Sequence, residues 1–510
     1  MNQVKLFDAN VEKFGNRDFV RVNGKGYTYS EIKSMSESAA GLFQQRGVRM
    51  GDRVSLMSQN TVSFVIAYFG ILMAGGVVVP VNHKLVAPEV DYILDNSGSK
   101  LFLFDGSLSD VAEKVTSDAK KLSMDTPAAG YESFDELFVK GAPYSPVPID
   151  DNEMAQILYT SGTTGKPKGC VITHNSTMLN GTFCALVMKM DEDSRLLMAM
   201  PIWHSSPLNN WFAGIQVVGG TMVLLREYHP LHFLQVIQEE KCTIYFGAPI
   251  SYILPLQLPN FDSFDLSSMN VWIYGGGPIS GETAKMVMSK YKSDKFYQVY
   301  GMTETGPQGM ILPPKDQIRK AGSIGRVGNP GVNIKVMKTA TEQARLGETG
   351  EIWLRAECVM KGYYNNPAAT ADVFAEGGWY KSGDIARLDD DNYLYIVDRS
   401  KDMIVTGGEN VYSKEVEDVA SVCPGVMEVA VIGVPHPSWG ETVAAIVVRV
   451  KDSGLDEDRI KAFLSDKLAK YKIPKIFQFV DGLPHTPSGK IMKYKLRETF
   501  NQESINMKGK

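Results

Sequence analysis

A short string rich in hydroxyl, glycine and lysine residues, between Tyr159 and Gly169, carries the strongest chemical signal in this sequence. Hydroxyl donors are supplied by Thr160, Ser161, Thr163 and Thr164. Backbone N–H groups without side-chain obstruction are available at Gly162, Gly165 and Gly169. Positive charge comes from Lys166 and Lys168. Such a loop suits the phosphates of a nucleotide. A Walker loop would open directly into a helix, whereas Pro167 follows the lysine here and apolar, strand-like runs flank the loop, so that motif is excluded.

A second motif, Tyr300-Gly-Met-Thr-Glu-Thr305, follows an aromatic-rich segment that is predicted to be a strand. A carboxylate after a small-residue turn, here Glu304, can hold Mg²⁺ against a nucleotide phosphate, and Thr303 can donate to the same phosphate. In isolation, an exposed glutamate in a loop is usually only solvated. Together with the hydroxyl- and glycine-rich loop, it predicts a metal site next to bound phosphates.

Three further segments could complete a nucleotide site. The glycines at 275–277 follow a predicted strand, and bare backbone there would let a flat ligand lie against it. Asp384 ends the string Tyr380-Lys-Ser-Gly-Asp, before a predicted strand that starts at Ile385, and its carboxylate can accept both ribose hydroxyls. Lys490 follows a glycine that leaves its approach open. If these residues bind no ligand, the glycines form an ordinary turn at the end of a strand and Lys490 is a solvated surface lysine.

Histidine and cysteine give neither a metal signal nor a disulfide signal. His229 and His232 flank a Pro-Leu pair and are expected to be surface or capping residues. The five cysteines are scattered without a Cys-x-x-Cys pair, and we expect reduced thiols of a cytosolic protein.

In their order along the chain, these motifs resemble those of the adenylate-forming superfamily, which includes acyl- and aryl-CoA ligases, luciferases and nonribosomal adenylation domains. The resemblance covers nearly the whole chain. It implies ATP, Mg²⁺ and, as a co-substrate, coenzyme A. It also implies a large N-terminal domain of two similar α/β subdomains plus a distorted β-barrel, followed by a small mobile α+β domain that carries a catalytic lysine.

The same resemblance implies roles for individual residues. Lys490 would bridge the attacking carboxylate and the α-phosphate, with Thr303 and Glu304 in the magnesium motif and His204 at the mouth of the acid pocket. Because a carboxylate substrate is already ionised near neutrality, His204 would orient or gate the substrate and would not act as a base. The implied ligand contacts are Thr160, Ser161, Gly162, Thr163, Thr164, Gly165 and Lys168 for phosphate, Glu304 and Thr164 for Mg²⁺, Gly275, Gly276, Gly277, Tyr300 and Gly301 for adenine and the acid, Asp384 and Arg399 for ribose, Lys401 for the hinge, and Gly407 and Gly408 for the thiol tunnel.

These residues need a scaffold of alternating strands and helices. A chain of 510 residues is too long for one core and predicts at least two domains. Thr28-Tyr-Ser-Glu31 predicts a capped helix start, and apolar residues at helical spacing continue toward Gly47. Apolar runs at 54–57, 77–79 and 101–104 predict buried strands, so the pattern favours an α/β class. Residues 70–76 resemble residues 214–220, which is either coincidence or a mark of two related halves.

The character of the sequence changes near residue 400. Beyond the charged segment 398–402, the patterns predict a self-contained small unit, with helices at 415–422 and 460–471 and strands at 429–434, 444–450 and 476–480. We place the boundary at Ser400–Lys401. This gives an AMP-binding domain over 1–399 and a lid domain over 400–510.

Composition argues against several other classes of protein. A net charge of −5 gives no electrostatic case for a nucleic-acid partner. The N-terminus has no apolar core of signal-peptide length. Residues 60–82 carry no charge, but glycines and a proline interrupt them, which favours a buried helix and a core strand over a membrane span. A cytoplasmic enzyme is expected, and a homodimer is left open.

The resulting hypothesis is an AMP-forming acid–thiol ligase acting on a small-molecule carboxylic acid. The carboxylate attacks the α-phosphate of ATP, pyrophosphate leaves, and the thiol of coenzyme A then displaces AMP from the acyl-adenylate. Gly301, where acetate-type members have tryptophan, predicts an open pocket end and favours a medium- or long-chain fatty acid, with an aromatic acid as the alternative. The predicted pocket residues are Ser205, Ser206, Asn209, Asn210, Trp211, Phe246, Ala248 and Gly275.

Three other functions are less favoured. A freestanding amino-acid adenylation enzyme would normally continue into a carrier domain, but this sequence ends about twenty residues after Lys490. A luciferase-like oxygenase shares the same motifs. A non-catalytic nucleotide-binding regulator would not need Lys490 together with Glu304 and Asp384.

Overall fold

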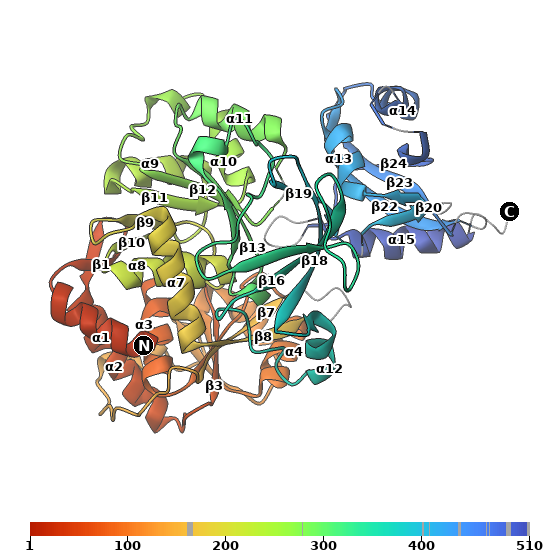
Figure 1. The fold of residues 1–510 in the computed structure, drawn as a ribbon. Helices are drawn as coiled ribbons and strands as arrows, with labels where there is room; N and C mark the ends of the chain where they lie inside the picture. Colours follow the sequence, from red (N-terminus) through yellow and green to blue (C-terminus); the bar gives the residue numbers. More distant parts are fainter. Residues whose placement is uncertain are drawn as a thin grey trace.

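The computed structural model describes residues 1–160, 167–277, 279–399, 402–406, 409–436, 440–465, 467–468, 470–485 and 491–506. Figure 1 shows a large body of two α/β sheets and a curled half-barrel, with a smaller blue α/β unit at one side. This architecture confirms the fold class predicted from the sequence. The predicted domain boundary at Ser400–Lys401 lies outside the described residues.

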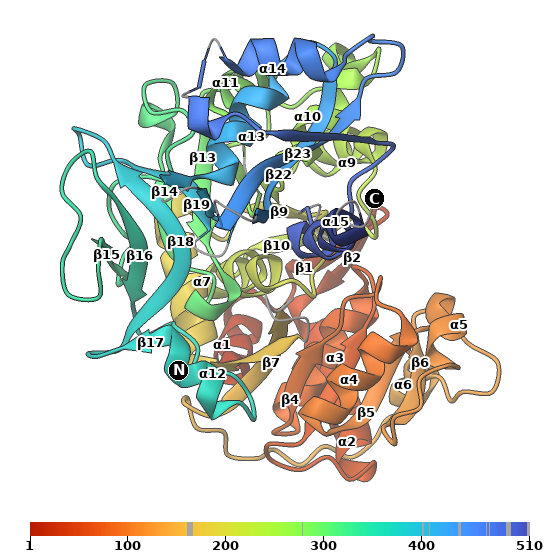
Figure 2. The same ribbon diagram turned by 90° about the vertical axis from the view of Figure 1, so that its right-hand side faces the viewer.

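The first sheet contains β3 (Arg53–Met57), β4 (Val77–Pro80), β5 (Ser99–Asp105), β6 (Lys120–Met124), β7 (Met154–Thr160) and β8 (Lys168–Thr173). The strand order is β6-β5-β3-β4-β7-β8, and the pairing is parallel except between β7 and β8. The accompanying helices are α2 (Tyr29–Gln45), α3 (Val62–Met73), α4 (Ala87–Ser97), α5 (Ser109–Ala112) and α6 (Phe134–Val139). Figure 2 shows α3 and α4 beside the orange strands. The predicted strands at 54–57, 77–79 and 101–104 are confirmed as β3, β4 and β5.

The second sheet contains β1 (Asp18–Val22), β2 (Lys25–Thr28), β9 (Arg195–Met198), β10 (Thr221–Leu224), β11 (Ile244–Gly247), β12 (Val271–Gly275), β13 (Phe296–Gly301) and β14 (Gly309–Leu312). Its order is β14-β13-β12-β11-β9-β10-β1-β2, with antiparallel pairs at its two ends. Its helices are α1 (Gln3–Phe14), α7 (His174–Met188), α8 (Ala213–Val218), α9 (Pro230–Glu240), α10 (Ile250–Ile253) and α11 (Gly281–Lys290). Parallel strands place their carboxyl ends at one edge, where ligand sites of open α/β sheets form.

The two sheets share a local construction that the sequence similarity between 70–76 and 214–220 anticipated. Gly75 and Gly219 have φ angles of +79° and +77° and end α3 and α8 in the left-handed conformation. In the next position, Gly76 and Gly220 donate their N–H groups to the carbonyls five residues earlier, at 2.8 and 3.1 Å. Strands β4 and β10 then begin at equivalent positions. The structure therefore favours two similarly built halves over coincidence.

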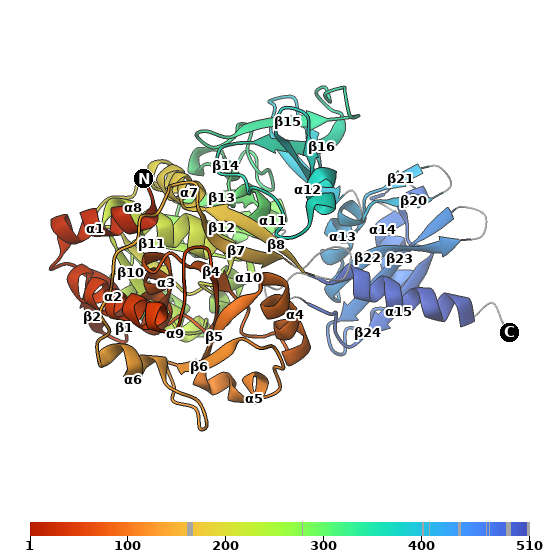
Figure 3. The same ribbon diagram turned by 90° about the horizontal axis from the view of Figure 1, so that it is seen from below.

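The curled half-barrel follows as an antiparallel sheet of β15 (Asn333–Met337), β16 (Thr349–Arg355), β17 (Phe374–Ala375), β18 (Trp379–Leu388) and β19 (Leu394–Arg399). The helix α12 (Pro367–Val373) lies beside it. The C-terminal sheet is formed by β20 (Ile404–Thr406), β21 (Glu409–Val411), β22 (Val426–His436), β23 (Gly440–Arg449) and β24 (Ile476–Val480), and its helices are α13 (Ser413–Ser421), α14 (Glu457–Ser465) and α15 (Lys493–Asn506). Figure 3 shows this unit projecting from the rest, with α15 along it.

The prediction of one continuous helix over 460–471 is wrong. Helix α14 ends at Ser465, and the apolar stripe continues through a short 3₁₀ turn at Lys470–Lys472, where Tyr471 is exposed. The carbonyl of Leu464 accepts from the N–H groups of both Lys467 and Leu468, at 3.0 and 2.8 Å, a shared bond typical of a helix end. Periodicity alone does not distinguish this tighter ending from a continuing α-helix.

The uncharged segment 60–82 forms α3 and β4, and both are buried. Thr61 caps α3 by accepting from the N–H of Phe64. Within the described ranges, no helix is long and apolar enough to cross a membrane. All five cysteines are buried free thiols, as expected from their spacing.

Candidate active site

The two ends of the predicted phosphate loop are fixed by the β7–β8 hairpin. Thr160 pairs with Lys168 at the last position of the ladder, and the Thr160 hydroxyl lies 3.4 Å from the Lys168 carbonyl oxygen that it donates to. The Lys168 ammonium lies over the ring of Tyr363, 5.1 Å from its centre. A strand, and no helix, follows the loop, in agreement with the rejection of a Walker motif. The loop residues Ser161, Gly162, Thr163, Thr164 and Gly165 lie outside the described residues.

Tyr363 connects this hairpin to Glu304 of the second motif. Its hydroxyl donates to Oε1 of Glu304 at 3.0 Å, and its backbone bridges to Cys170 of β8. Burial, with a smaller contribution from the Glu304 charge, raises the pKa of Tyr363, so its hydroxyl stays protonated and remains a donor. Sequence reasoning missed Tyr363, because an aromatic residue far along the chain has no spacing that links it to either motif.

Glu304 lies in a 3₁₀ turn (Thr303–Thr305), and its carbonyl accepts from the N–H of Met360 at 2.9 Å. In the described part of the chain, no group of three His, Cys, Asp or Glu residues could enclose a metal ion. One oriented carboxylate beside a phosphate loop nevertheless fits Mg²⁺, because this ion is usually held by one or two carboxylates together with substrate phosphates.

Strands β12 and β13 pair up to Gly275 and Val299, next to the residues predicted for the adenine site. Gly275 pairs with Val299, and a Cβ atom at position 275 would lie 2.6 Å from the Val299 carbonyl oxygen, so only glycine fits. Gly276 has a φ of +73°, which also favours glycine. Tyr300 follows Val299 on β13. Bare backbone beside an aromatic ring is suited to a planar base such as adenine.

Asp384 is held between Tyr300 and Arg399, and its role as a ribose contact stays a prediction. The Tyr300 hydroxyl donates to Oδ2 at 2.8 Å, and Nε of Arg399 lies 3.1 Å from Oδ1. The side chain of Asp384 is 8% exposed, so the carboxylate is presented from a nearly buried position. Burial and the adjacent Asp384 charge raise the pKa of Tyr300, while Asp384 raises that of Arg399. The trio can therefore offer a charged acceptor for a pair of hydroxyl groups.

The strand context of Asp384 differs from the expectation. Strand β18 is continuous from Trp379 to Leu388 and includes Asp384, whereas the sequence suggested a strand beginning at Ile385. Gly383 has a φ of +72°, and its N–H donates to Glu351 Oε1 at 2.8 Å. This side-chain acceptor lets the strand pass through a left-handed residue that would normally mark a turn.

His204 lies in the loop that leads from β9 into a π-helical turn (Pro207–Phe212). Its N–H donates to the Pro201 carbonyl at 3.0 Å, and its carbonyl accepts from Leu208 at 3.1 Å. Next to it, Nε1 of Trp203 donates to Nδ1 of His83 at 2.9 Å. Burial and the neighbouring Lys84 lower the pKa of His83, which keeps Nδ1 available as an acceptor. The loop is thus held by its backbone, as a gating or orienting histidine requires.

Most of the residues predicted to line the acid pocket are buried, among them Asn209, Asn210 and Trp211. Trp211 stacks on Phe246 with ring centres 5.0 Å apart. A Cβ atom at Gly301 would overlap the carbonyl oxygen of Pro307, so only glycine fits there, and the open pocket end stays a prediction. The remaining predicted residues of catalysis, hinge and thiol tunnel, Lys490, Lys401, Gly407 and Gly408, lie outside the described residues.

Three comparisons with known proteins, by family model, by sequence and by structure, agree with one another. Residues 7–364 match the family "AMP-binding enzyme", and residues 415–490 match "AMP-binding enzyme C-terminal domain". The chain is 36% identical to a feruloyl-CoA synthase of an Amycolatopsis species over 94% of this chain and 95% of that protein. It is 35% identical to the long-chain-fatty-acid–CoA ligase FadD13 of Mycobacterium tuberculosis, over 93% of each chain. The ATP-bound crystal structure of MatB from Rhodopseudomonas palustris superposes with a TM-score of 0.88 at 30% identity, covering 98% of this chain and 99% of that one.

Proposed function

This chain belongs to the family of AMP-binding enzymes and is an AMP-forming acid–CoA ligase, and we propose that its acid substrate is an aryl acid. The nucleotide is ATP, in line with the ATP-bound relative. The observation that carries the nucleotide half of the proposal is the carboxylate of Asp384 held between Tyr300 and Arg399. Tyr300, which donates to Asp384, follows Val299, the strand partner of Gly275, so an adenosine bound here would have its ribose at Asp384 and its base near this glycine backbone.

In the first step, a carboxylate oxygen of the acid attacks the α-phosphorus of ATP, and the bond to the β-phosphate breaks. Lys490 places its ammonium between the two reacting anions and offsets the negative charge that builds there. Thr160, Lys168 and the loop between them hold the departing pyrophosphate. Glu304 and Thr164 would hold Mg²⁺, which would neutralise phosphate charge.

In the second step, the sulfur of coenzyme A attacks the carbonyl carbon, and the bond from that carbon to the AMP oxygen breaks. The thiol needs space near the α-phosphate, which Lys490 occupies during the first step. We therefore assign Lys401 as the hinge about which the C-terminal unit reorients, with Gly407 and Gly408 beside the incoming thiol.

The aryl assignment rests on the shape and polarity of the acid pocket. Trp211 and Phe246, both predicted to line the pocket, stack on each other, and a planar acid would pack against such aromatic rings. A cavity of about 10 Å³ lies next to Trp211 and ends at hydrogen-bonded amides that include Asn210 and Gln308. The feruloyl-CoA synthase that is 36% identical over 94% of this chain also supports an aryl acid. A medium-chain fatty acid is the second candidate, because Phe183, Met188 and Ile311 give the same cavity an apolar side.

Pyrophosphate release from ATP, measured with aryl and aliphatic acids of matched length and with and without coenzyme A, tests this assignment. We expect aryl acids to give the higher kcat/KM and to yield the CoA thioester. If aliphatic acids of eight to twelve carbons are preferred, the fatty-acid alternative replaces the aryl one. If no acid supports pyrophosphate release, the proposed reaction itself is wrong.

Replacing Lys490 by alanine tests the division of labour between the two steps. We expect adenylate formation to fall by about 10²-fold or more, because an ammonium that stabilises transition-state charge is lost. Thioester formation from synthetic acyl-adenylate should stay near the level of the unmodified enzyme. Both half-reactions are measured separately, and an equal loss in the two would contradict the role given to Lys490.

A further inference from the structure

The loop that carries His204 is held by two side chains from the other half of the large body. The loop belongs to the second sheet and runs from the end of β9 at Met198 to the π-helical turn. The side chains that hold it come from the first sheet: Asn60 lies between β3 and α3, and His83 lies between β4 and α4. Both halves therefore meet at carboxyl ends of parallel strands, where ligand sites of such sheets form.

The amide of Asn60 fixes the path of the loop backbone before it reaches His204. Its Nδ2 donates to three carbonyl oxygens, each 3.0 Å away, those of Met198, Met200 and Leu225. Its Oδ1 accepts from the N–H of Ile202 at 2.7 Å. Asn60 is only 2% exposed, and buried backbone groups without partners are costly. The backbone from 198 to 202 is therefore tied to one side chain of the first sheet.

His83 holds the next residue of the loop. Nε1 of Trp203 donates to Nδ1 of His83 at 2.9 Å, and the two rings meet edge to face with centres 6.0 Å apart. A neutral imidazole that accepts at Nδ1 carries its proton on Nε2, and among the described residues this buried Nε2 has no hydrogen-bond partner. On its other side, Trp203 lies against His204, with ring centres 5.8 Å apart. His83 thus reaches His204 through a single indole ring.

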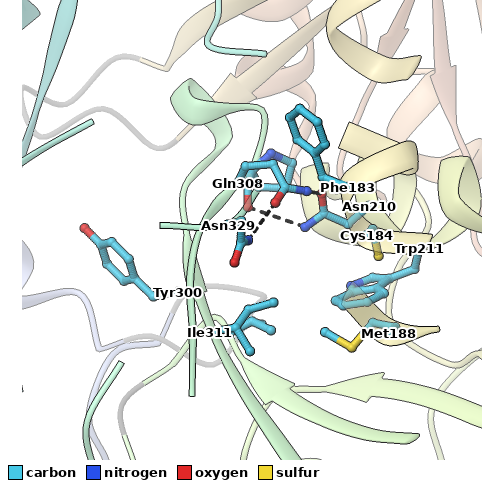
Figure 4. A pocket seen from close by; sticks show the side chains of 11 residues that line it. Phe183, Cys184, Met188, Asn210, Trp211, Tyr300, Gln308, Ile311 and Asn329 are labelled. Atoms are coloured by element: carbon cyan, nitrogen blue, oxygen red, sulfur yellow. Dashed lines mark hydrogen bonds between the residues drawn. The ribbon is translucent and has the colours of Figure 1, made fainter. Parts of the chain in front are cut away.

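The held loop belongs to the acid side of the site. After His204 it enters the π-helical turn, whose Asn210 and Trp211 line the cavity of the acid pocket (Figure 4). The predicted ATP contacts come from other elements, namely the β7–β8 hairpin, the 3₁₀ turn of Glu304 and strand β18 with Asp384. A displacement of the loop would therefore disturb the acid and leave the nucleotide contacts in place.

We propose that Asn60 and His83 are positioning residues for the acid substrate, which fix the loop from 199 to 204 so that His204 meets the incoming acid in one orientation. Neither residue touches the reacting atoms. Both act across the junction of the two sheets, so productive binding of the acid depends on how the two halves are joined. This inference rests on the proposed acid–CoA ligase reaction and on the role given to His204.

The exchange of pyrophosphate into ATP, which reports the first step alone, tests the role of His83 in the complete enzyme with Mg²⁺. The acid is the one with the highest kcat/KM among the aryl and aliphatic acids compared above. In His83→Leu, we expect kcat/KM for the acid to fall by about tenfold and KM for ATP to change by less than about twofold, because only the acid loses its orientation. His83→Asn keeps an acceptor near the position of Nδ1 and should restore most of the loss.

Trp203→Phe removes the donor from the same hydrogen bond. When His83→Leu is added to Trp203→Phe, the further loss should be small, because the second change removes the partner of a bond that is already lost. Losses that multiply in the double variant would show that the two residues act independently, against the proposal.

Asn60→Ala tests the other support, with Asn10→Ala as its matched control. Asn10 is also 2% exposed, and its Nδ2 donates to a backbone carbonyl, that of Gln216 in α8, away from the loop. Both variants should lower the melting temperature, but only Asn60→Ala should lower kcat/KM for the acid, by about tenfold or more. If Asn60→Ala does not fold, the half-buried His83 and its two variants decide the outcome.

The possible failures can be told apart. If no acid of the panel supports pyrophosphate exchange, the proposed reaction fails, and the positioning role fails with it. If exchange occurs but His83→Leu affects the acid and ATP equally, or if Asn60→Ala and Asn10→Ala lose the same factor in kcat/KM for the acid, these residues only stabilise the fold. The positioning role is then overturned while the ligase assignment stands.

Discussion

At the residue scale, the site relies on carboxylates that buried tyrosines hold in place. Tyr300 donates to Asp384, and Tyr363 donates to Glu304. Burial raises the pKa of both tyrosines, so neither hydroxyl ionises in the range where a nucleotide-dependent enzyme works. Each carboxylate is thereby held in a fixed orientation, and Arg399 contacts the second oxygen of Asp384. One hydrogen bond of this kind supports the proposed ribose contact, and the other supports the proposed magnesium contact.

Asp125 gives a residue-scale prediction away from the site. Its Oδ2 accepts from Ser58 and Thr61 at 2.9 Å each, and burial, with Asp105 and Asp135 nearby, raises its pKa to about 6. A carboxyl whose folded pKa is raised favours the folded state most below its ordinary pKa, and that contribution is lost as pH rises through about 6.

We therefore expect Asp125→Asn to gain stability relative to the unmodified protein between pH 4 and pH 7.5, on the order of 2 kcal/mol. Asparagine also tolerates the φ of +62° at this position. Unfolding by denaturant at several pH values measures the difference. Parallel stability curves for the two proteins would contradict the prediction.

At the element scale, the sequence predicted what local patterns determine and missed what tertiary contacts determine. The capping box of Thr28 and Glu31 is confirmed, because both of its hydrogen bonds join residues three apart. Strand β24 has the same first and last residues as the strand predicted over 476–480. Asn180 and Gln308 could not be identified as partners, because 128 residues separate them and each is an ordinary amide within its own segment.

A polar contact network joins the half-barrel to the C-terminal unit. The N–H and hydroxyl of Ser413, the first residue of α13, donate to Asp398 of β19. Lys493, the first residue of α15, donates to the Ser413 hydroxyl at 2.6 Å and lies 2.7 Å from Glu417. Burial raises the pKa of Asp398 and of Glu417, and the Lys493 charge opposes both shifts. The Lys493 ammonium thus compensates two nearly buried carboxyls. Lys493 lies three residues after Lys490.

Lys493→Met should destabilise the C-terminal unit by about 3–5 kcal/mol, because it leaves buried carboxylates without their cation. The loss should be larger at pH 8 than at pH 5, since protonation at the lower pH removes the uncompensated charge. Lys495→Met changes an exposed lysine in the same helix and serves as the control. Thermal unfolding of the three proteins at both pH values measures the effect, and equal melting temperatures for the two variants would refute the role of Lys493.

At the scale of the whole molecule, side-chain hydrogen bonds among the described residues join the parts on either side of the predicted hinge. Thr349 of β16 and Tyr412, just before α13, have their hydroxyl oxygens 3.2 Å apart. The second contact is that of Ser413 with Asp398. Both join the half-barrel to the C-terminal unit, so a reorientation about Lys401 would have to break or exchange them. The proposed two-step reaction therefore needs a backbone at 401 that can rotate.

Lys401→Pro tests this requirement, because proline restricts φ to about −65° and removes one backbone donor. We expect thioester formation from synthetic acyl-adenylate to slow by about tenfold or more, while pyrophosphate exchange with ATP and the acid changes little. Lys451→Pro is a matched control, because Lys451 lies in a turn where proline is tolerated. The turn is closed by a hydrogen bond from the Ser453 N–H to the Val450 carbonyl, and the next residue, Asp452, has a φ of +59°. The decisive quantity is the ratio of the two partial rates. If Lys401→Pro leaves this ratio as it is in Lys451→Pro and in the unmodified enzyme, reorientation about residue 401 does not limit the second step.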